Sequence, residues 1–157
     1  MRFEHVIIIN DPTDLMTSPL TMEQVWQGLL LRARAPQLFM QGVERVSVDE
    51  TDATLILREM QLGNLMVRDR IHLEAPFKMH FDTEANDQHP GGQLYVTVEA
   101  PANETLIIRF VYETPHDDSG QGEEAQLLGY LKAAYRANDV DAVRRIRELA
   151  EAGKLEG

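Results

Sequence analysis

The chain has no cysteine among its 157 residues, which excludes disulfides, thiolate metal ligands and cysteine nucleophiles. It also lacks any run approaching the roughly 20 apolar residues of a membrane-spanning helix. The longest early apolar run, Val6-Ile7-Ile8-Ile9, is shorter than a signal-peptide core, and no small-residue cleavage site follows it. We therefore expect a soluble, cytoplasmic protein that forms a single domain over residues 1–157.

Basic residues are scarce, because 15 Lys and Arg stand against 26 Asp and Glu and the net charge is −11. A surface that binds phosphates needs clustered basic side chains. The one basic cluster, Arg144, Arg145 and Arg147, alternates with Glu148 and Glu151 at helical i,i+4 spacing. This spacing is typical of a solvated helix face, so we expect no nucleic-acid partner.

Known catalytic and cofactor motifs are missing as well. The five histidines show no spacing that would place them on one metal ion, and no Gly-x-Ser-x-Gly motif occurs. The loop glycines match neither a phosphate-binding loop nor a dinucleotide fingerprint. We expect neither a metal nor a cofactor.

The first third of the chain predicts a strand and then a helix. Residues 2–10 are rich in β-branched side chains and predict a strand. Thr21 and Gln24 form a capping-box pattern that begins a helix, and Pro36 ends it. A further short turn is expected as far as Met40, since proline is favoured at the start of a helix.

From residue 43 the apolar period changes to two, which indicates strands joined by short loops. Gly63-Asn64 is a two-residue hairpin signal of the type II′ kind. With the first strand, this makes about seven strands. The later ones are expected near residues 43–49, 53–62, 65–74, 77–82, 93–100 and 104–113.

The last part of the chain predicts two helices. Leu127, Leu128, Leu131 and Tyr135 lie on one helical stripe, and Asn138 is a residue type that can end a helix. A separate helix is then expected over residues 139–152, with Asp139 or Asp141 as its cap.

An antiparallel sheet with one apolar face must have that face covered, and the C-terminal helix is the most apolar cover in this chain. The strand that ends in Asn10-Asp11-Pro12, the Val25-Trp26-x-x-Leu29 helix, and Ala35-Pro36 leading to Gly42-Val43 resemble the START/Bet v 1-like superfamily. This superfamily is also called SRPBCC or helix-grip, and the chain looks closest to its AtaL-like group.

The resemblance covers residues 1–137 and implies an α+β fold. It implies a curved antiparallel sheet of about seven strands gripping a long C-terminal helix, with a short helical insert after the first strand. The helix expected over 139–152 is an addition to that fold. Superfamily members bind lipids, sterols and other apolar molecules between sheet and helix, and some cyclise polyketides.

The hairpin register predicts which residues face the interior. A two-residue turn at Gly63-Asn64 places Met60 opposite Val67 and Arg58 opposite Asp69 on one face, which is otherwise apolar. Arg58 could bind a ligand carboxylate or enolate with Asp69 orienting it, or Asp69 could act as a general base. A structural ion pair, or a register slip that sends both outward, remains open.

The predicted ligand site combines this polar pair with an apolar wall. Tyr112 ends an apolar row, so it is a second weak catalytic candidate besides Asp69 and a candidate hydrogen-bonding group. We expect the mouth beside the loops at 83–91 and 114–122. The wall is expected to comprise Met60, Val67, Met79, Val96, Ile108, Phe110, Leu128 and Leu131.

Three functions fit these residues. The leading prediction is binding of a small hydrophobic molecule, with aromatic and polyketide-like ones among the candidates. The second is a polyketide cyclase or aromatase in which Asp69 or a tyrosine moves protons. The third is an interaction module that fills its own core, with a homodimer left open.

Overall fold

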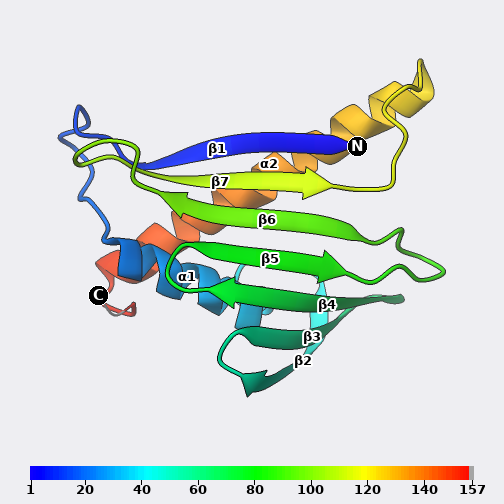
Figure 1. Ribbon diagram of the computed structural model, residues 1–157, viewed down its shortest axis with the longest axis horizontal. Coiled ribbons are helices and arrows are strands. Elements are labelled where there is room, and N and C mark those ends of the chain that lie inside the picture. Colours follow the sequence, from blue (N-terminus) through cyan, green and yellow to red (C-terminus); the bar gives the residue numbers. More distant parts are fainter. Residues whose placement is uncertain (156–157) are drawn as a thin grey trace.

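The computed structural model describes residues 1–155, which contain a seven-stranded antiparallel sheet (Figure 1). Strands β2 to β7 form a continuous meander, and β1 pairs with β7 at the far edge. The predicted α+β helix-grip architecture is confirmed. The strands are β1 Arg2–Asn10, β2 Val43–Asp52, β3 Leu55–Leu62, β4 Leu65–Glu74, β5 Lys78–Thr83, β6 Gly92–Glu99 and β7 Leu106–Glu113.

Two α-helices lie against the same face of the sheet, behind it in Figure 1. They are α1, Met22–Arg34, and α2, Glu123–Glu151, and a short 3-10 helix η1, Pro36–Leu38, follows α1. Within residues 1–155, no helix combines the length and the apolar character needed to cross a membrane.

The predicted start and end of α1 are confirmed. The Thr21 hydroxyl accepts a hydrogen bond from the Gln24 backbone nitrogen at 3.0 Å, and the Gln24 side chain accepts one from the Thr21 backbone nitrogen at 2.9 Å. This reciprocal pair satisfies two backbone donors that a helix start leaves free. The helix stops at Arg34, before Ala35 and Pro36, because proline disfavours a helical conformation in the residue before it.

The hairpin between β3 and β4 has the predicted register. Gly63 takes a φ of +60°, which the first position of a type II′ turn requires. Met60 therefore lies opposite Val67, and Arg58 lies opposite Asp69. Since both members of each pair are buried, this face is the inner one, which rules out the register slip.

The prediction of two C-terminal helices is wrong. One helix of 29 residues runs through Asn138, so residues 139–152 form no separate element. The apolar stripe explains the continuity, because Tyr135, Asp139, Ala142 and Ile146 follow at i+3 and i+4 spacing and turn to the same side. Asp139 is a buried residue within the helix and not its cap.

The N-terminal part of α2 reaches beyond the sheet edge at β1 (Figure 1). Leu127 and Tyr130 are consequently 65% and 63% exposed. The buried residues of α2 all lie in its C-terminal half and are Asp139, Ala142, Ile146 and Leu149, while Tyr135 before them is partly buried against the core. About half of the length of α2 therefore packs against the sheet.

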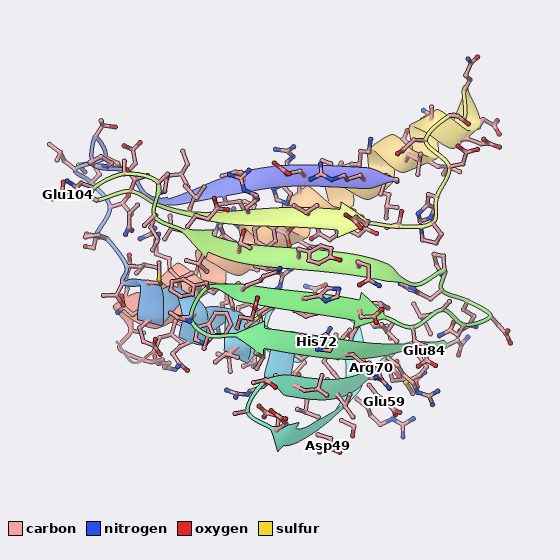
Figure 2. All side chains as sticks on the ribbon, viewed as in Figure 1. Asp49, Glu59, Arg70, His72, Glu84 and Glu104 are labelled. Carbon is pink, nitrogen blue, oxygen red and sulfur yellow. The ribbon has the colours of Figure 1, made fainter. Side chains whose placement is uncertain are left out.

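The outer face of the sheet carries many charged side chains, together with the exposed Val6, Ile8 and Leu57. Asp49, Glu59, Arg70 and His72 project from it toward the viewer in Figure 2. It follows that the inner face, between sheet and helices, is the one that can enclose an apolar site.

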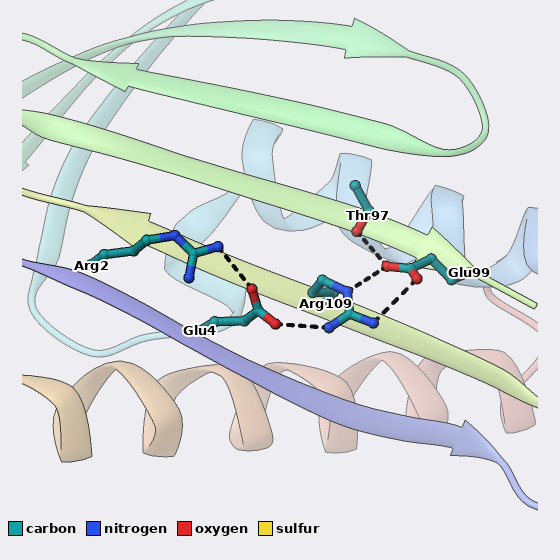
Figure 3. A network of polar contacts seen from close by, with 5 residues as sticks. All are labelled: Arg2, Glu4, Thr97, Glu99 and Arg109. Carbon is teal, nitrogen blue, oxygen red and sulfur yellow. Dashed lines mark hydrogen bonds and ion pairs between the residues drawn. The ribbon is translucent and has the colours of Figure 1, made fainter. Parts of the chain in front are cut away.

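A five-residue network crosses β1, β7 and β6 on the outer face (Figure 3). Arg109 donates to Glu4 at 2.9 Å and to Glu99 at 2.8 Å. Hydrogen bonds from Arg2 and Arg109 lower the pKa of Glu4, and one from Arg109 lowers the pKa of Glu99. The network thus ties the edge strand β1 to its neighbours through exposed ion pairs.

The helices make their closest approach where α1 meets α2 at Gly28. A Cβ at this position would stand 2.6 Å from Ile146 Cγ2 and 2.7 Å from its Cγ1, far inside van der Waals contact. Glycine is therefore required here to let the two backbones come together over the core. The core comprises Ile9, Leu20, Val25, Trp26, Leu29, Leu30, Ala33, Ile56, Ile71, Leu73, Met79, Val96, Val98, Leu106, Ile108, Phe110, Tyr112 and Ile146.

Gly28→Ala should lower the free energy of unfolding by about 1–2 kcal/mol, since the overpacking cost exceeds the gain in helix propensity. Gly129→Ala is the matched control, because a Cβ added to this helical glycine would have no neighbour within 4 Å. It should raise the stability by up to about 1 kcal/mol. Urea denaturation checks both, and a stabilised Gly28→Ala would contradict the close approach.

Candidate ligand pocket

A cavity of about 250 Å³ lies between the inner face of the sheet, η1 and α2. Residues from the loops after β5 and β7 line it, so it opens at the predicted end of the sheet. Its apolar lining consists mainly of Phe39, Met40, Met60, Val67, Phe81, Leu94, Tyr112 and Tyr135. Its polar lining includes Arg32, Arg58, Asp69, Thr83, Gln93 and Asn138.

The structure brings five of the predicted site residues together at this cavity: Arg58, Asp69, Met60, Val67 and Tyr112. The other predicted wall residues lie elsewhere. Met79, Val96, Ile108 and Phe110 are fully or almost fully buried in the core, and Leu128 and Leu131 are half-buried on α2 outside the cavity lining.

The reason lies in depth along the strands. Met79, Val96 and Phe110 stand opposite one another in one row across β5, β6 and β7. The neighbouring row toward the loops contains Phe81, Leu94 and Tyr112, and this row lines the cavity. Alternation along a strand identifies the inner face, but it does not say which row a cavity will reach.

The predicted Arg58–Asp69 pair is present and buried. Arg58 Nε and Nη2 donate to Asp69 Oδ2 at 2.9 and 2.5 Å, and Nη1 donates to the Ala33 carbonyl at 3.0 Å. Thr83 donates to the other carboxylate oxygen at 2.6 Å. Only 8% of Arg58 and 5% of Asp69 are exposed.

These contacts limit what the pair can do chemically. All three guanidinium nitrogens of Arg58 and both oxygens of Asp69 already have partners. A general base needs a free lone pair within reach of the proton it removes. With three of the roughly four lone-pair positions of Asp69 already accepting hydrogen bonds, the pair is better suited to holding Arg58 in place at the cavity wall than to moving protons.

A second buried polar cluster borders the same cavity, and the sequence did not reveal it. Asp139 on α2 is completely inaccessible to solvent. Its Oδ2 accepts a hydrogen bond from the Tyr112 hydroxyl at 2.5 Å and lies 2.7 Å from His5 Nε2, while its Oδ1 accepts one from Arg32 Nη2 at 3.0 Å. One carboxylate thus joins α2 to β7, β1 and α1.

The tautomer of His5 follows from this geometry. A carboxylate only accepts hydrogen bonds, so His5 donates through Nε2. Its Nδ1 is buried and has no partner among the described residues. The ring lies between aromatic neighbours, with Phe110 stacked at a centroid distance of 5.0 Å.

One sequence signal could have identified this cluster. Asp139 falls on the apolar stripe of α2, four residues after Tyr135 and three before Ala142. A charged residue on such a stripe must be paired when the stripe is buried. The expected helix end at Asn138 concealed the signal, because it turned Asp139 into a cap.

Tyr112 connects the cluster to the cavity. Burial, followed by the negative charge of Asp139, strongly raises the pKa of the Tyr112 hydroxyl, although the Arg32 charge acts in the opposite direction. The ring stacks on Tyr135 at a centroid distance of 4.1 Å, and burial raises the pKa of Tyr135 as well. Both tyrosines line the cavity, and the raised pKa values keep both hydroxyls protonated at neutral pH.

Metal ligands do not gather anywhere in residues 1–155, since no group of three or more His, Asp and Glu side chains comes together in a metal-binding arrangement. The polar lining of the cavity consists instead of hydrogen-bonding groups.

Comparison with known families identifies the family to which the chain belongs. A family model described as AtaL, acetylaranotin biosynthesis cluster protein L, matches residues 7–153. The chain belongs to the AtaL family. A search of curated proteins finds no match to this AtaL-family chain.

Solved structures with the same fold have low sequence identity to the AtaL-family chain. The di-domain aromatase/cyclase StfQ from the steffimycin biosynthetic pathway matches with a TM-score of 0.68 and 15% identity, covering 96% of this chain and 50% of StfQ. The chain therefore spans half the length of that protein. The Zhui aromatase/cyclase from Streptomyces sp. R1128 matches with a TM-score of 0.59 and 14% identity over 96% of this chain and 93% of Zhui.

A third similar structure is Ara h 8.0201, with a TM-score of 0.58 and 10% identity over 97% of this chain and 98% of that protein. Identities this low establish the fold alone. The AtaL-family chain has the helix-grip, Bet v 1-like fold, which confirms the resemblance seen in the sequence.

Asp139→Asn should lower the free energy of unfolding by about 3–5 kcal/mol, because it leaves buried partners without their counter-charge. Asp141→Asn, which removes an exposed ion pair with Arg144 on the same helix, should cost less than about 1 kcal/mol. Urea denaturation measures both. Equal losses in the two variants would contradict a structural role for Asp139.

Alkaline pH should destabilise the protein through Tyr112. The pKa of its hydroxyl is raised in the folded state, so its contribution is complete below the unfolded pKa of about 10 and is lost as the pH rises above that value. Between pH 9 and 11 the wild type should lose about 1.4 kcal/mol more stability than Tyr112→Phe. Denaturation at both pH values tests this, with Tyr130→Phe, an exposed tyrosine, expected to follow the wild type.

Proposed function

We propose that this protein binds a small hydrophobic molecule in the cavity between the sheet and α2, with aromatic and polyketide-like molecules as the leading candidates. The observation that carries the proposal is the cavity itself, an apolar space with a few polar groups at its wall. This combination is typical of small-molecule sites, in which apolar contacts provide affinity and a few polar groups fix orientation.

The lining favours a flat ligand. Four aromatic rings, those of Phe39, Phe81, Tyr112 and Tyr135, border the cavity, and Met40 and Met60 add flexible thioethers. Aromatic faces pack well against planar molecules, and methionine adapts to their outline. At about 250 Å³ the cavity lies just below the roughly 300–1,000 Å³ of usual ligand pockets, so the ligand is small.

Two of the predicted site residues form the polar anchor in this proposal. Arg58 and Asp69 sit at the cavity floor with Thr83, and their side chains are held in place by one another. A pre-organised polar group costs little ordering when a ligand arrives, so a fixed pair can orient a ligand efficiently.

A cyclase or aromatase activity is the second candidate, and the similarity to StfQ and Zhui favours it. In that case Asp69 and Tyr112 are the candidates for proton transfer at the cavity, but the Asp69 carboxylate is already ion-paired with Arg58 and accepts a hydrogen bond from Thr83 as well. The Tyr112 proton, however, is directed to Asp139. Binding therefore fits the ground-state geometry better than proton transfer does.

Blocking the cavity tests the proposal. Met60→Trp places an indole in the cavity, and it should abolish co-purification of a small molecule in native mass spectrometry and reduce the affinity for a flat aromatic probe such as 9-fluorenone at least about tenfold. Met66→Trp is the matched control, since Met66 lies opposite Gln61 on the outer side of the same hairpin.

Wild-type and Met66→Trp protein should bind alike. A wild type that carries no extra mass and shows no thermal shift with any flat apolar compound would argue against a ligand-binding function.

A further inference from the structure

The Asp139 cluster provides a second polar end to the cavity. Asp139 itself does not line the cavity, but two of its partners, Arg32 and Tyr112, do. The cluster is thus placed to act on a ligand through these two side chains.

Arg32 has hydrogen-bonding capacity to spare, whereas Arg58 has little. In the described part of the chain Arg32 donates only through Nη2, to Asp139, out of the five N–H donors of a guanidinium. Its side chain is 22% exposed against 8% for Arg58, whose three nitrogens are all engaged. Most of the available donors at this cavity therefore lie on Arg32, which uses one of its five N–H groups where Arg58 uses three.

The two polar ends stand well apart. Asp69 lies on β4 and Tyr112 on β7, which are three strand spacings away from one another, or about 14 Å.

The formal charges around the cavity indicate which flat molecules it would bind. Arg32 is paired with Asp139, which lies behind the lining, and Arg58 is paired with Asp69, so the two ion pairs together carry no net formal charge. The whole chain carries −11. Neither the cavity nor the surrounding protein therefore favours an anionic ligand. The unused N–H groups of Arg32 do favour a ligand that carries a hydrogen-bond acceptor.

We propose that Arg32, held in place by Asp139, is a binding residue for a neutral carbonyl oxygen on a flat apolar ligand. This inference rests on the proposed function and deepens it, because it names the ligand chemistry and a residue that the sequence did not single out. Asp139 and His5 are positioning residues that do not touch the ligand. Tyr112 lines the cavity beside Arg32 and shares the Asp139 carboxylate with it.

The pre-set geometry is what makes Arg32 effective. The Asp139 carboxylate is fully buried and takes a bond from Tyr112 as well as from Arg32, so both side chains are ordered before a ligand enters. Immobilising a flexible arginine at the moment of binding would reduce the affinity. The fixed guanidinium avoids that loss.

A matched pair of probes isolates the carbonyl contact. 9-Fluorenone and fluorene share the same three-ring outline, and only the former carries a carbonyl oxygen. Equilibrium dialysis should show that the wild type binds 9-fluorenone at least about tenfold more tightly than fluorene, as a hydrogen bond from a charged donor implies. Arg32→Met should bring the two dissociation constants to within about twofold of each other.

Arg34→Met is the control, because Arg34 lies on the same helical turn, is exposed and is paired with Glu50. It should keep the wild-type preference. Where Arg32→Met fails to fold, Arg32→Met/Asp139→Asn removes both charges together, and it should show the same loss of preference.

Three results would overturn the inference in distinguishable ways. If the wild type binds both probes equally, the carbonyl makes no contact and the ligand-binding function still stands. If both affinities fall in Arg32→Met while their ratio persists, Arg32 only supports the fold. If the wild type binds neither probe, the proposed function fails together with the inference.

Discussion

The rest of the structure depends on the hydrogen bonds of one carboxylate, that of Asp139. It is inaccessible to solvent and joins α2 to Arg32 on α1, to Tyr112 on β7 and to His5 on β1. Burying a charge costs several kcal/mol unless partners satisfy it. A helix that packs through an apolar stripe alone could shift slightly without losing its contacts. Asp139, by contrast, can reach Arg32, Tyr112 and His5 together in only one position of α2. The cluster therefore fixes where the helix crosses the sheet and how far it extends beyond it.

The cavity is a consequence of that placement and of side-chain size. Beneath the packed half of α2 and α1, the row of Met79, Val96 and Phe110 fills the interior. Two rows nearer the loops, beyond Phe81, Leu94 and Tyr112, the inward-facing residues are Thr83 and Gly92, which lie opposite one another, and Thr83 lies opposite Asp69. Small side chains on the floor and a helix that leaves the sheet together produce a hollow. Its walls are aromatic because Phe81 and Tyr112 from the intervening row, Tyr135 on α2 and Phe39 just after η1 supply the rings.

The Arg32–Asp139 and Arg58–Asp69 ion pairs give the cavity polar groups that the fold alone does not specify. The same architecture occurs in Ara h 8.0201 and in aromatase/cyclases, so a function must be argued from the site and not from the fold. Here Asp69 and Asp139 each accept three hydrogen bonds, and each arginine is balanced by a carboxylate. Such a site suits the neutral ligand that we propose. Neither carboxylate is unpaired in this geometry, which is why we propose binding ahead of catalysis.

The sequence by itself determined what depends on neighbours along the chain. The turn at Gly63 and the period-two pattern set the register that pairs Arg58 with Asp69, and local capping and proline signals set both ends of α1. Only the tertiary structure decided the role of Asp139, because a histidine 134 residues away and an arginine 107 residues away create its environment. The tertiary structure also decided which rows of inward-facing residues line the cavity and which rows, such as that of Met79, are buried in the core. Alternation encodes the direction of a side chain, whereas depth depends on where a distant helix crosses the sheet.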